Sequence, residues 1–361
     1  MTNIGVDVNL IPVMVNISKN INPELSTKAK LLMILRDTTE KPISGSKLAA
    51  SLGISRVAIW KGIQSLAGAG YSIEASDSGY TLDLEKAGDF LYPWEFGDKE
   101  AMFRHFDTID STMDKAKECA LNGFDAGTIV IAESQSAGRG RYGRKWNSRQ
   151  GGLYFTILDR PRHSWPKMTL ADYSLLSMLY QIAVGRALNA MTGKPAQLRW
   201  PNDVYMGGQK IAGLITELSG ESDSISWMLT GIGVNVNNAV ALGRAVNCVE
   251  VSGRPLSRRD LLLSILDELE RLKNLFSTGA AYAQGNRLLA AEWNAMADNI
   301  GMKAAVIDSG FEDDAAGSRE PRVFARGVYS GIDPAGRCII KADNQTLYFN
   351  PGPISVVFPR E

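Results

Sequence analysis

The sequence is poor in cysteine and histidine, and this scarcity excludes several classes of protein. Its 361 residues include three cysteines and two histidines. Cys119, Cys248 and Cys338 lie far apart in the chain, and neither His105 nor His163 has companions at metal-ligand spacing. This pattern argues against a zinc site, a disulfide framework and a secreted protein, so we predict no metal-ligand cluster.

The chain also lacks a long apolar run, an excess of charge and a P-loop. No stretch of ~20 apolar residues occurs, and no basic region precedes the first apolar stretch, which predicts a soluble, cytoplasmic protein without a membrane partner. The formal net charge is zero, so any contact with nucleic acid must come from a local patch. Without a Gly-x-x-x-x-Gly-Lys-Ser/Thr sequence, any ATP site is of another type.

Length and patterning favour several domains of α+β class. With 45% hydrophobic and 22% charged residues, the chain can build two or three cores. We predict an irregular extension over 1–24, a winged helix-turn-helix domain over 25–87, a catalytic domain over 100–298 and a small SH3-like β-barrel over 301–361. A linker with Gly88, Pro93 and Gly97 separates the first two domains.

The predicted winged helix consists of three capped helices and a hairpin. Ser26 or Thr27, Ser44 and Ser55 can cap the helices, and a hairpin follows over 71–82. In the third helix we expect an inward face of Val57, Trp60, Ile63 and Leu66. The outward face then presents the candidate DNA-binding residues Ser55, Arg56, Lys61 and Gln64, together with Ala58. A small helical module for protein contacts remains the alternative.

The central region predicts a sheet with a few long helices on one side. Expected strands are 128–132, 153–158, 197–200, 210–217 and 226–233, and expected helices are 111–121, 171–191 and 258–276. Five further strands are expected at the C-terminal end, over 304–307, 323–329, 338–341, 346–349 and 354–358.

Two separated parts of this central region, residues 138–146 and residues 199–213, favour an anion site. Residues 138–146 read Gly-Arg-Gly-Arg-Tyr-Gly-Arg-Lys-Trp, residues 199–203 read Arg-Trp-Pro-Asn-Asp, and residues 210–213 read Lys-Ile-Ala-Gly. Alternating glycines let a backbone approach a ligand while guanidinium groups gather around a phosphate or carboxylate. The residues alone equally allow a solvated basic loop, and Lys210 alone could be an ordinary strand end.

These segments resemble those of the bifunctional biotin protein ligases, which also repress biotin synthesis genes. The resemblance includes both segments, together with Gly-Ile-Gly-Val-Asn-Val at 231–236, and it spans nearly the whole chain. It implies a central domain of the biotin/lipoate ligase type. That domain joins biotin and ATP into biotinyl-5'-adenylate with release of pyrophosphate, and then transfers biotin to a lysine on the biotin acceptor domain of a carboxylase.

The resemblance also implies roles for individual residues. Lys210, Arg141 and Arg139 are the catalytic candidates, because they stabilise negative charge at the reacting carboxylate and α-phosphate. The implied biotin-binding residues are Ser111, Thr112, Met113, Gln135, Arg139, Gly140, Arg141 and Lys210. The implied nucleotide-binding residues are Trp146, Asn202, Asp203 and Asn235. Without the resemblance, Asp110 and Ser111 would be interpreted as plain helix caps.

Two positions depart from the relatives, and several partners follow from the resemblance. Met113 stands where asparagine is usual and removes one polar contact, while Tyr142 stands where a further arginine is frequent. Mg²⁺ is expected to enter with ATP, held mainly by phosphates. The implied partners are operator DNA and, when adenylate is bound, a second copy of the chain. Two other functions stay open: a ligand-sensing transcription factor without turnover, and a lipoate-type acyl ligase.

Overall fold

The computed structural model describes residues 22–38, 41–84, 86, 88–161, 173–221, 224–240, 243, 245–274, 281–308 and 322–358. They belong to two compact units, Met1–Ala101 and Met102–Glu361. Most of the extension predicted over 1–24 lies outside the described residues. Across the described part of the chain, no helix has both the length and the apolar character needed to span a bilayer.

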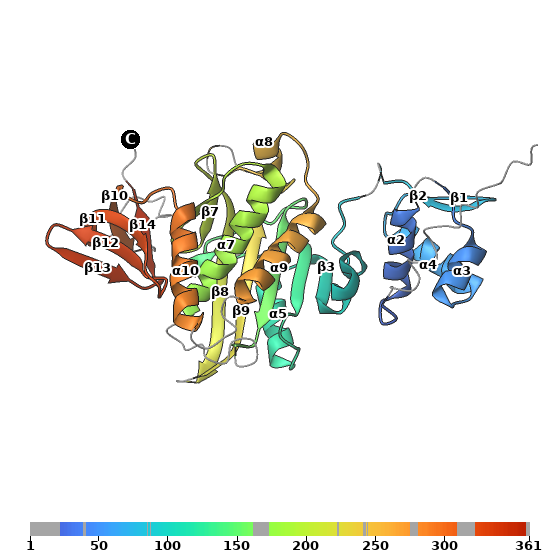
Figure 1. Ribbon diagram of the computed structural model, residues 1–361, viewed down its shortest axis with the longest axis horizontal. Helices are drawn as coiled ribbons and strands as arrows, with labels where there is room; N and C mark the ends of the chain where they lie inside the picture. Colours follow the sequence, from blue (N-terminus) through green and yellow to red (C-terminus); the bar gives the residue numbers. More distant parts are fainter. Residues whose placement is uncertain are drawn as a thin grey trace, which may run out of the picture. The chain divides into compact units, whose positions relative to one another are not determined.

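The first unit is a three-helix domain with a β-hairpin. Its elements are α2 (Thr27–Asp37), α3 (Gly45–Leu52), α4 (Arg56–Gly68), β1 (Ile73–Ser76) and β2 (Gly79–Leu82), drawn in blue in Figure 1. Side chains of Ser26, Ser44 and Ser55 each accept a hydrogen bond from a backbone amide in the first turn of α2, α3 and α4. Gly53 ends α3 in the left-handed region, at φ 64°. The caps and the turn therefore define the helix-turn-helix, as the sequence predicted.

The core of this unit corrects the face predicted for α4. Ile59, Ile63 and Leu66 of α4 are buried among the leucines of α2, whereas Val57 is 62% exposed and Trp60 is 54% exposed. The inward orientation expected for Val57 and Trp60 was therefore wrong. An exact three-residue spacing drifts around a helix of 3.6 residues per turn, and the four-residue step from Ile59 to Ile63 keeps to one face.

The segment after the hairpin folds back onto these helices and is not a free linker. It includes the 3-10 segment η1 (Pro93–Met102). The buried carboxylate of Glu95 accepts hydrogen bonds from Tyr71 and from Arg36, the latter at 2.7 Å. Burial raises the pKa of the Tyr71 hydroxyl, and the neighbouring Glu95 raises it further. Residues up to Ala101 thus belong to the first unit.

The second unit contains a seven-stranded mixed sheet with the order β3-β4-β5-β9-β8-β7-β6. The strands are β3 (Phe103–Ile109), β4 (Ile129–Gln135), β5 (Leu153–Asp159), β6 (Gln197–Arg199), β7 (Asp203–Met206), β8 (Gln209–Glu221) and β9 (Ser224–Val234). Strands β3 and β4 are parallel, and the other neighbours are antiparallel. The sheet confirms the predicted α+β class, although β3 and β7 were not anticipated.

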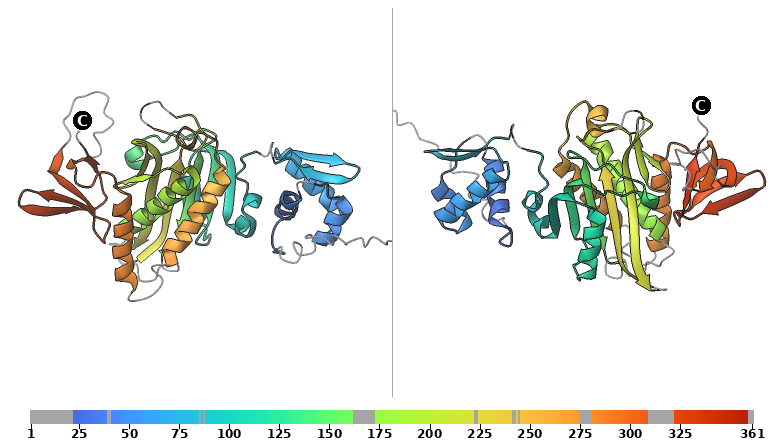
Figure 2. Two further views of the ribbon diagram at one scale, coloured as in Figure 1. Left: turned by 45° about the horizontal axis from the view of Figure 1, so that its top comes forward. Right: turned by 180° about the vertical axis from the view of Figure 1, so that it is seen from behind.

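Helices cover both faces of this sheet, whereas the sequence suggested one. The elements are α5 (Thr112–Leu121), η2 (Arg141–Gly143), α7 (Tyr173–Thr192), α8 (Cys248–Ser252), α9 (Arg258–Asn274) and α10 (Ala281–Met296). Helices α7 and α9 pack together over one face, and α5 lies on the face seen from behind in Figure 2. Side-chain contacts support this arrangement. Val130 and Leu229 of the sheet pack against α5, whereas the hydroxyl of Thr216 forms a hydrogen bond with that of Ser177 in α7, on the other face.

The C-terminal part is a five-stranded antiparallel sheet with the order β13-β12-β11-β10-β14. Its strands are β10 (Lys303–Asp308), β11 (Val323–Ile332), β12 (Cys338–Ala342), β13 (Gln345–Phe349) and β14 (Ile354–Val357). All five strands were predicted. The turn before β12 is held by the Asp333 carboxylate, which accepts hydrogen bonds from the amides of Ala335 and Arg337. The small β domain is thus present, and closure into an SH3-like barrel stays a prediction.

Candidate functional site

The arginine-rich loop over 138–146 is folded by its own backbone. The amide of Gly140 donates to the carbonyl of Arg144 at 2.7 Å, and the amide of Trp146 donates to that of Gly138 at 2.9 Å. Tyr142, at the tip, has a left-handed backbone with φ 58°. These bonds make the loop a tight hairpin-like projection between β4 and β5, so its side chains fan out around a short turn.

Trp146 lies across glycines of β8 and β9. A Cβ atom at Gly233 would be 2.4 Å from Nε1 of Trp146, and one at Gly213 would be 3.0 Å from Cζ3 of the same ring. At Gly233 a side chain would clash with the indole, and at Gly213 it would crowd the ring. The Trp146 Nε1 atom is buried and makes no hydrogen bond within the described residues. The ring is therefore held flat against the sheet with an unused donor.

Lys210 lies beside this indole and forms an ion pair with Asp203. Its Nζ is 2.7 Å from Oδ1 of Asp203 and 5.4 Å from the centre of the Trp146 ring. Both charged side chains are partly exposed, at 28% for Lys210 and 25% for Asp203. The β7–β8 hairpin places the two residues on adjacent strands, where Lys210 pairs with Tyr205 and Asp203 pairs with Gly213.

Arg141 connects the loop to the strand end that carries Asp203. Its Nη1 donates to Oδ1 of Asn202 at 3.1 Å, and Asn202 Nδ2 donates to the carbonyl of Leu214 at 2.6 Å. Arg141 Nη2 and the Tyr142 hydroxyl both donate to the carbonyl of Gly352 in the C-terminal domain. Arg141, Asn202, Asp203, Lys210 and Trp146 thus form one contiguous cluster.

Arg139 extends in a different direction. Its guanidinium pairs with Asp114 in the first turn of α5, and both side chains are exposed. Gly140 is half-buried and lies between the two arginines. The structure therefore does not join Arg139 to the Arg141–Lys210 cluster by a direct contact, although it places Arg139 next to the helix that begins with the predicted biotin-binding hydroxyls.

The start of α5 contains a cluster of polar side chains, Ser111, Thr112 and Gln135, called the polar knot below. Oε1 of Gln135 accepts from the amide of Thr112 at 2.8 Å and from its hydroxyl at 3.1 Å, and thereby caps the helix. Ser111 is the N-cap residue, is buried, and makes no side-chain cap bond. Met113 packs against β9, where a Cβ at Gly231 would lie 2.7 Å from its Sδ atom. Four of the predicted biotin-binding residues, Ser111, Thr112, Met113 and Gln135, thus lie together around the start of α5.

Asn235 belongs to a neighbouring asparagine network. Its backbone amide donates to the carbonyl of Ile211, the residue after Lys210. Its side-chain Oδ1 accepts a hydrogen bond from Nδ2 of Asn238. Asn238 and Asn247 continue the chain of bonds. Asn235 therefore braces the strand that carries Lys210.

Two residues of the polar knot were missed from the sequence. The hydroxyl of Thr156 donates to that of Thr112 at 2.9 Å, and the hydroxyl of Ser148 accepts from Gln135 Nε2 at 2.7 Å. Both side chains are buried. Thr156 is the one polar residue between Leu153 and Leu158 of β5, which would have marked it, whereas no local signal marks Ser148.

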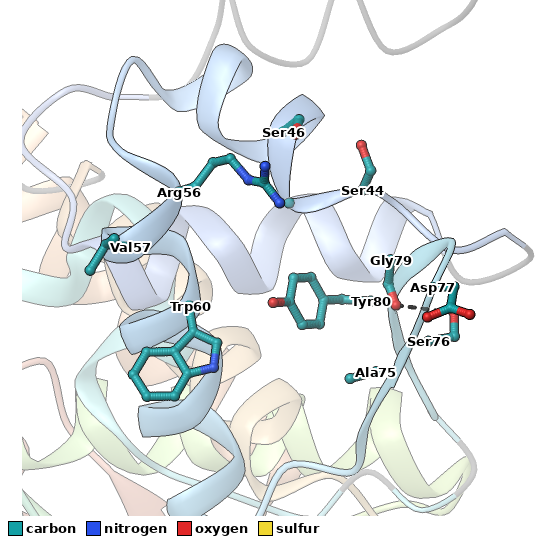
Figure 3. A pocket seen from close by; sticks show the side chains of 11 residues that line it. Ser44, Ser46, Arg56, Val57, Trp60, Ala75, Ser76, Asp77, Gly79 and Tyr80 are labelled. Carbon is teal, nitrogen blue, oxygen red and sulfur yellow. Dashed lines mark hydrogen bonds between the residues drawn. The ribbon is translucent and has the colours of Figure 1, made fainter.

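In the first unit, the predicted DNA-binding residues lie on the exposed side of α4. Arg56, Lys61 and Gln64 are exposed, and Ser55 is exposed while its hydroxyl accepts from the Ala58 amide at 3.1 Å. Beside them lies a hollow of about 600 Å³ between the starts of α3 and α4 and the hairpin (Figure 3). Its lining is Ser44, Gly45, Ser46, Arg56, Val57, Trp60, Ala75, Ser76, Asp77, Gly79 and Tyr80.

Comparisons with known proteins agree with both units. Residues 105–236 match the biotin/lipoate A/B protein ligase family, and residues 27–81 match a helix-turn-helix domain. The chain is 32% identical over 305 residues to a bifunctional ligase/repressor BirA of Bacillus spizizenii, covering 80% of this chain and 90% of that protein. It is 32% identical over 242 residues to a biotin–[acetyl-CoA-carboxylase] ligase of Paracoccus denitrificans, covering 64% and 91%.

A solved structure shares its fold with a large part of this chain. A biotin protein ligase from Aquifex aeolicus, in complex with biotin and ATP, superposes with a TM-score of 0.57 at 24% identity and covers 71% of this chain and 99% of that one. At this identity the likeness concerns the fold alone.

Proposed function

The chain belongs to the family of bifunctional biotin ligases and repressors, and on that premise we propose how its two units perform these activities. The second unit forms biotinyl-5'-AMP from biotin and ATP and transfers the biotinyl group to an acceptor lysine. The first unit binds operator DNA. One observation carries the site assignment: Arg141 reaches Asn202, and the adjacent Asp203 is paired with Lys210 beside Trp146.

The first half-reaction brings two anions together. An oxygen of the biotin carboxylate attacks the α-phosphorus of ATP, the bond to the β-phosphate oxygen breaks, and pyrophosphate leaves. Lys210 and Arg141 supply fixed positive charge where negative charge grows at the α-phosphate, and neither needs to transfer a proton. Arg139 approaches from the α5 side and completes the set of cations around the carboxylate.

The Lys210–Asp203 pair holds the ammonium in place until substrates arrive. The carboxylate neighbour orients the ammonium, and substrate oxygens replace that neighbour as the closer anion. Asp203 is the carboxylate of this cluster, and a single carboxylate suits an Mg²⁺ ion that arrives on ATP and is held mainly by phosphates and water. Beside Asp203, an Mg²⁺ ion brought in with ATP would supply positive charge to the phosphates.

The buried knot at the start of α5 is suited to the polar end of biotin. Ser111, Thr112 and Gln135 present hydroxyl and amide groups that match the donors and acceptors of a cyclic urea. Met113, where relatives carry an asparagine, contributes an apolar wall next to Gly231. The buried Nε1 of Trp146 has no partner among the described residues, so it is available to the ligand. Asn202 and Asn235 lie on the adenosine side.

In the second half-reaction the acceptor lysine attacks the biotinyl carbonyl, and AMP leaves with its phosphate. Water must be kept from the mixed anhydride during the interval. The contacts of Arg141 and Tyr142 with Gly352 draw the loop to the C-terminal domain and contribute to this exclusion. The acceptor we propose is the biotin acceptor domain of a carboxylase.

Repression follows from the same adenylate. Bound biotinyl-5'-AMP favours a homodimer, and two winged helices then occupy two half-sites on operator DNA when acceptor is scarce. Sedimentation of the full chain with and without biotin plus ATP tests this link. A dimerisation constant that ligand leaves unchanged removes it. Arg56→Ala and Lys61→Ala are each expected to reduce the salt dependence of DNA affinity by about one unit of slope.

Two assays test the ligase activity. Biotin-dependent exchange between ATP and pyrophosphate reports the first half-reaction, and transfer of labelled biotin to a carboxylase acceptor domain reports the second. Exchange without any turnover on the acceptor contradicts the transfer role, and absence of exchange identifies a sensor without turnover. Exchange that depends on lipoate instead of biotin assigns the chain to the other branch of acyl ligases.

A further inference from the structure

Helix α4 exposes two large apolar side chains side by side. Val57 and Trp60 are 62% and 54% exposed, and they lie three residues apart, on successive turns of one face. The core of the unit does not use them, because Ile59, Ile63 and Leu66 already fill the opposite face. A tryptophan left half in water beside a valine marks a contact surface.

The apolar pair is framed by cations and by the hairpin. Arg56 and Lys61 are exposed on the same side of α4. In Figure 3, the side chains of Arg56, Trp60 and Tyr80 border one hollow, which Ser46 of α3 also lines. Asp77, at the tip of the hairpin, is the acidic residue of the lining. Cations near α4 suit a polyanion that approaches along this helix.

The apolar pair selects what part of a nucleic acid lies against it. In the major groove of DNA, the C5-methyl group of thymine is the apolar feature that a base pair presents, and apolar side chains recognise it. Phosphates flank the groove and suit Arg56 and Lys61. A protein partner would have to accommodate these cations with carboxylates of its own, whereas duplex DNA supplies methyl groups and phosphates together.

We propose that Val57 and Trp60 read thymine methyl groups in the operator, and that this pair determines part of the sequence specificity of the repressor. The inference rests on the proposed DNA-binding function of the first unit. Arg56 and Lys61 position α4 on the phosphates and carry no sequence information of their own. Trp60 and Val57 then discriminate thymine from cytosine at the facing positions.

The test begins with a probe obtained from the protein itself. Duplexes are selected from a random-sequence pool with the full-length wild-type chain in the presence of biotin and ATP. Each thymine of the recovered site is then replaced by deoxyuridine, which removes only the methyl group. Loss of one buried methyl contact is expected to weaken wild-type binding about fourfold at the positions facing α4.

Variants of the protein test whether Trp60 causes the loss of affinity for the deoxyuridine duplexes. Trp60→Ala is expected to bind the thymine and deoxyuridine duplexes at those positions equally, while Trp60→Phe keeps part of the difference. Lys61→Ala should weaken binding to both duplexes alike. Met33→Ala, which removes a 38% exposed apolar side chain from α2, should change neither affinity. Circular dichroism melting verifies that each variant folds.

The outcomes separate this inference from the function beneath it. If Trp60→Ala retains the full wild-type penalty for deoxyuridine, the inference is overturned while DNA binding stands. If Trp60→Ala instead changes only self-association of the chain without DNA, the surface is a contact between copies and the inference is equally overturned. If the wild-type chain enriches no sequence at all, the proposed repressor function fails first.

Discussion

Asp203 and Lys210, on adjacent strands of the β7–β8 hairpin, form an ion pair with 2.7 Å between Oδ1 and Nζ. Each residue comes from a different sequence segment, and neither alone identifies a site. Their pairing next to Trp146 and Asn202 creates a cationic group whose position is determined before any substrate binds. Preorganised charge of this kind is the main means by which an enzyme can stabilise a growing phosphate charge.

Replacing Lys210 by alanine should therefore affect the chemistry more than the fold. We expect biotin-dependent ATP–pyrophosphate exchange to fall by about 10²–10³-fold, the usual effect of removing one preorganised donor. Exchange kinetics at saturating biotin and ATP measure the loss. Lys194→Ala, an exposed lysine after α7, is the matched control and should leave exchange unchanged. A Lys210→Ala enzyme with wild-type rates in both half-reactions would contradict the assigned role.

Removing the hydroxyl of Tyr142 should loosen the loop. Tyr142→Phe removes the hydroxyl, which donates to the carbonyl of Gly352 and accepts from Arg141 Nη2, and leaves the ring in place. A neutral hydrogen bond contributes about 1 kcal/mol, so we expect biotinyl-5'-AMP to dissociate roughly fivefold faster. Release of labelled adenylate into a chase measures this rate. The control is Tyr348→Phe, which removes the hydroxyl of a half-exposed tyrosine in the C-terminal domain, the domain that contains Gly352. Equal release rates in all three proteins would show that the contact does not retain the adenylate.

A methyl group at Gly233 should displace Trp146. The new Cβ of Gly233→Ala would lie 2.4 Å from the indole Nε1, so the ring or the strand must move. We expect a loss of about 1–3 kcal/mol of stability, as for overpacked cores, together with raised KM values for biotin and ATP. Thermal melting and initial-rate kinetics measure the two effects.

Gly68→Ala is the control for this change. Its Cβ would meet no atom within 4 Å, and the residue ends helix α4. Alanine there should be neutral or slightly stabilising and should not alter either KM. A Gly233→Ala enzyme that also keeps wild-type KM values would refute the packing of Trp146 on that glycine.

The pair of Glu133 and Arg258 predicts a pH-dependent contribution to stability. Glu133 Oε2 is 2.6 Å from Nη1 of the buried Arg258, and Oε1 is 3.4 Å from Nε2 of His105. Burial alone would raise the pKa of Glu133, but the bonds to His105 and Arg258 outweigh it and hold that pKa below its usual 4.5. The ionised carboxylate therefore stabilises the fold above pH 4.5, and this contribution is lost as pH falls through the lower folded-state pKa.

Glu133→Gln should accordingly lower the free energy of unfolding by roughly 1–3 kcal/mol at pH 7, since Arg258 loses its charged partner. The difference in the free energy of unfolding between variant and wild type should become smaller when urea denaturation is repeated at acid pH, below the usual pKa of the carboxyl. Glu118→Gln, on the exposed side of α5, should show no such gap. A difference that is constant over this pH range would argue against the linkage.

Local chemistry explains what could be predicted from the sequence. Serine caps at Ser26, Ser44 and Ser55 begin three helices through bonds within four residues, and Asp333 organises its turn in the same local manner. Short alternating segments likewise sufficed for the C-terminal strands. The family and its chemistry followed from the glycine-arginine loop and Lys210, because those motifs are contiguous in the chain.

The remaining features depended on contacts between distant residues. The inward face of α4 was wrong at Val57 and Trp60 because three-residue spacing cannot tell which side meets α2. Strands β3 and β7 and helix α10 were not anticipated. Strand β3 pairs with β4 across the intervening helix α5, whereas β7 is only four residues long and pairs with its chain neighbours β6 and β8. The sequence by itself therefore determined the helix caps, the turns and the kinds of charge available. Only the tertiary structure decided that Arg141 meets Gly352, that Lys210 meets Asp203 and that Trp60 faces solvent, because side chains far apart in sequence meet only when the sheet has paired and the core has packed.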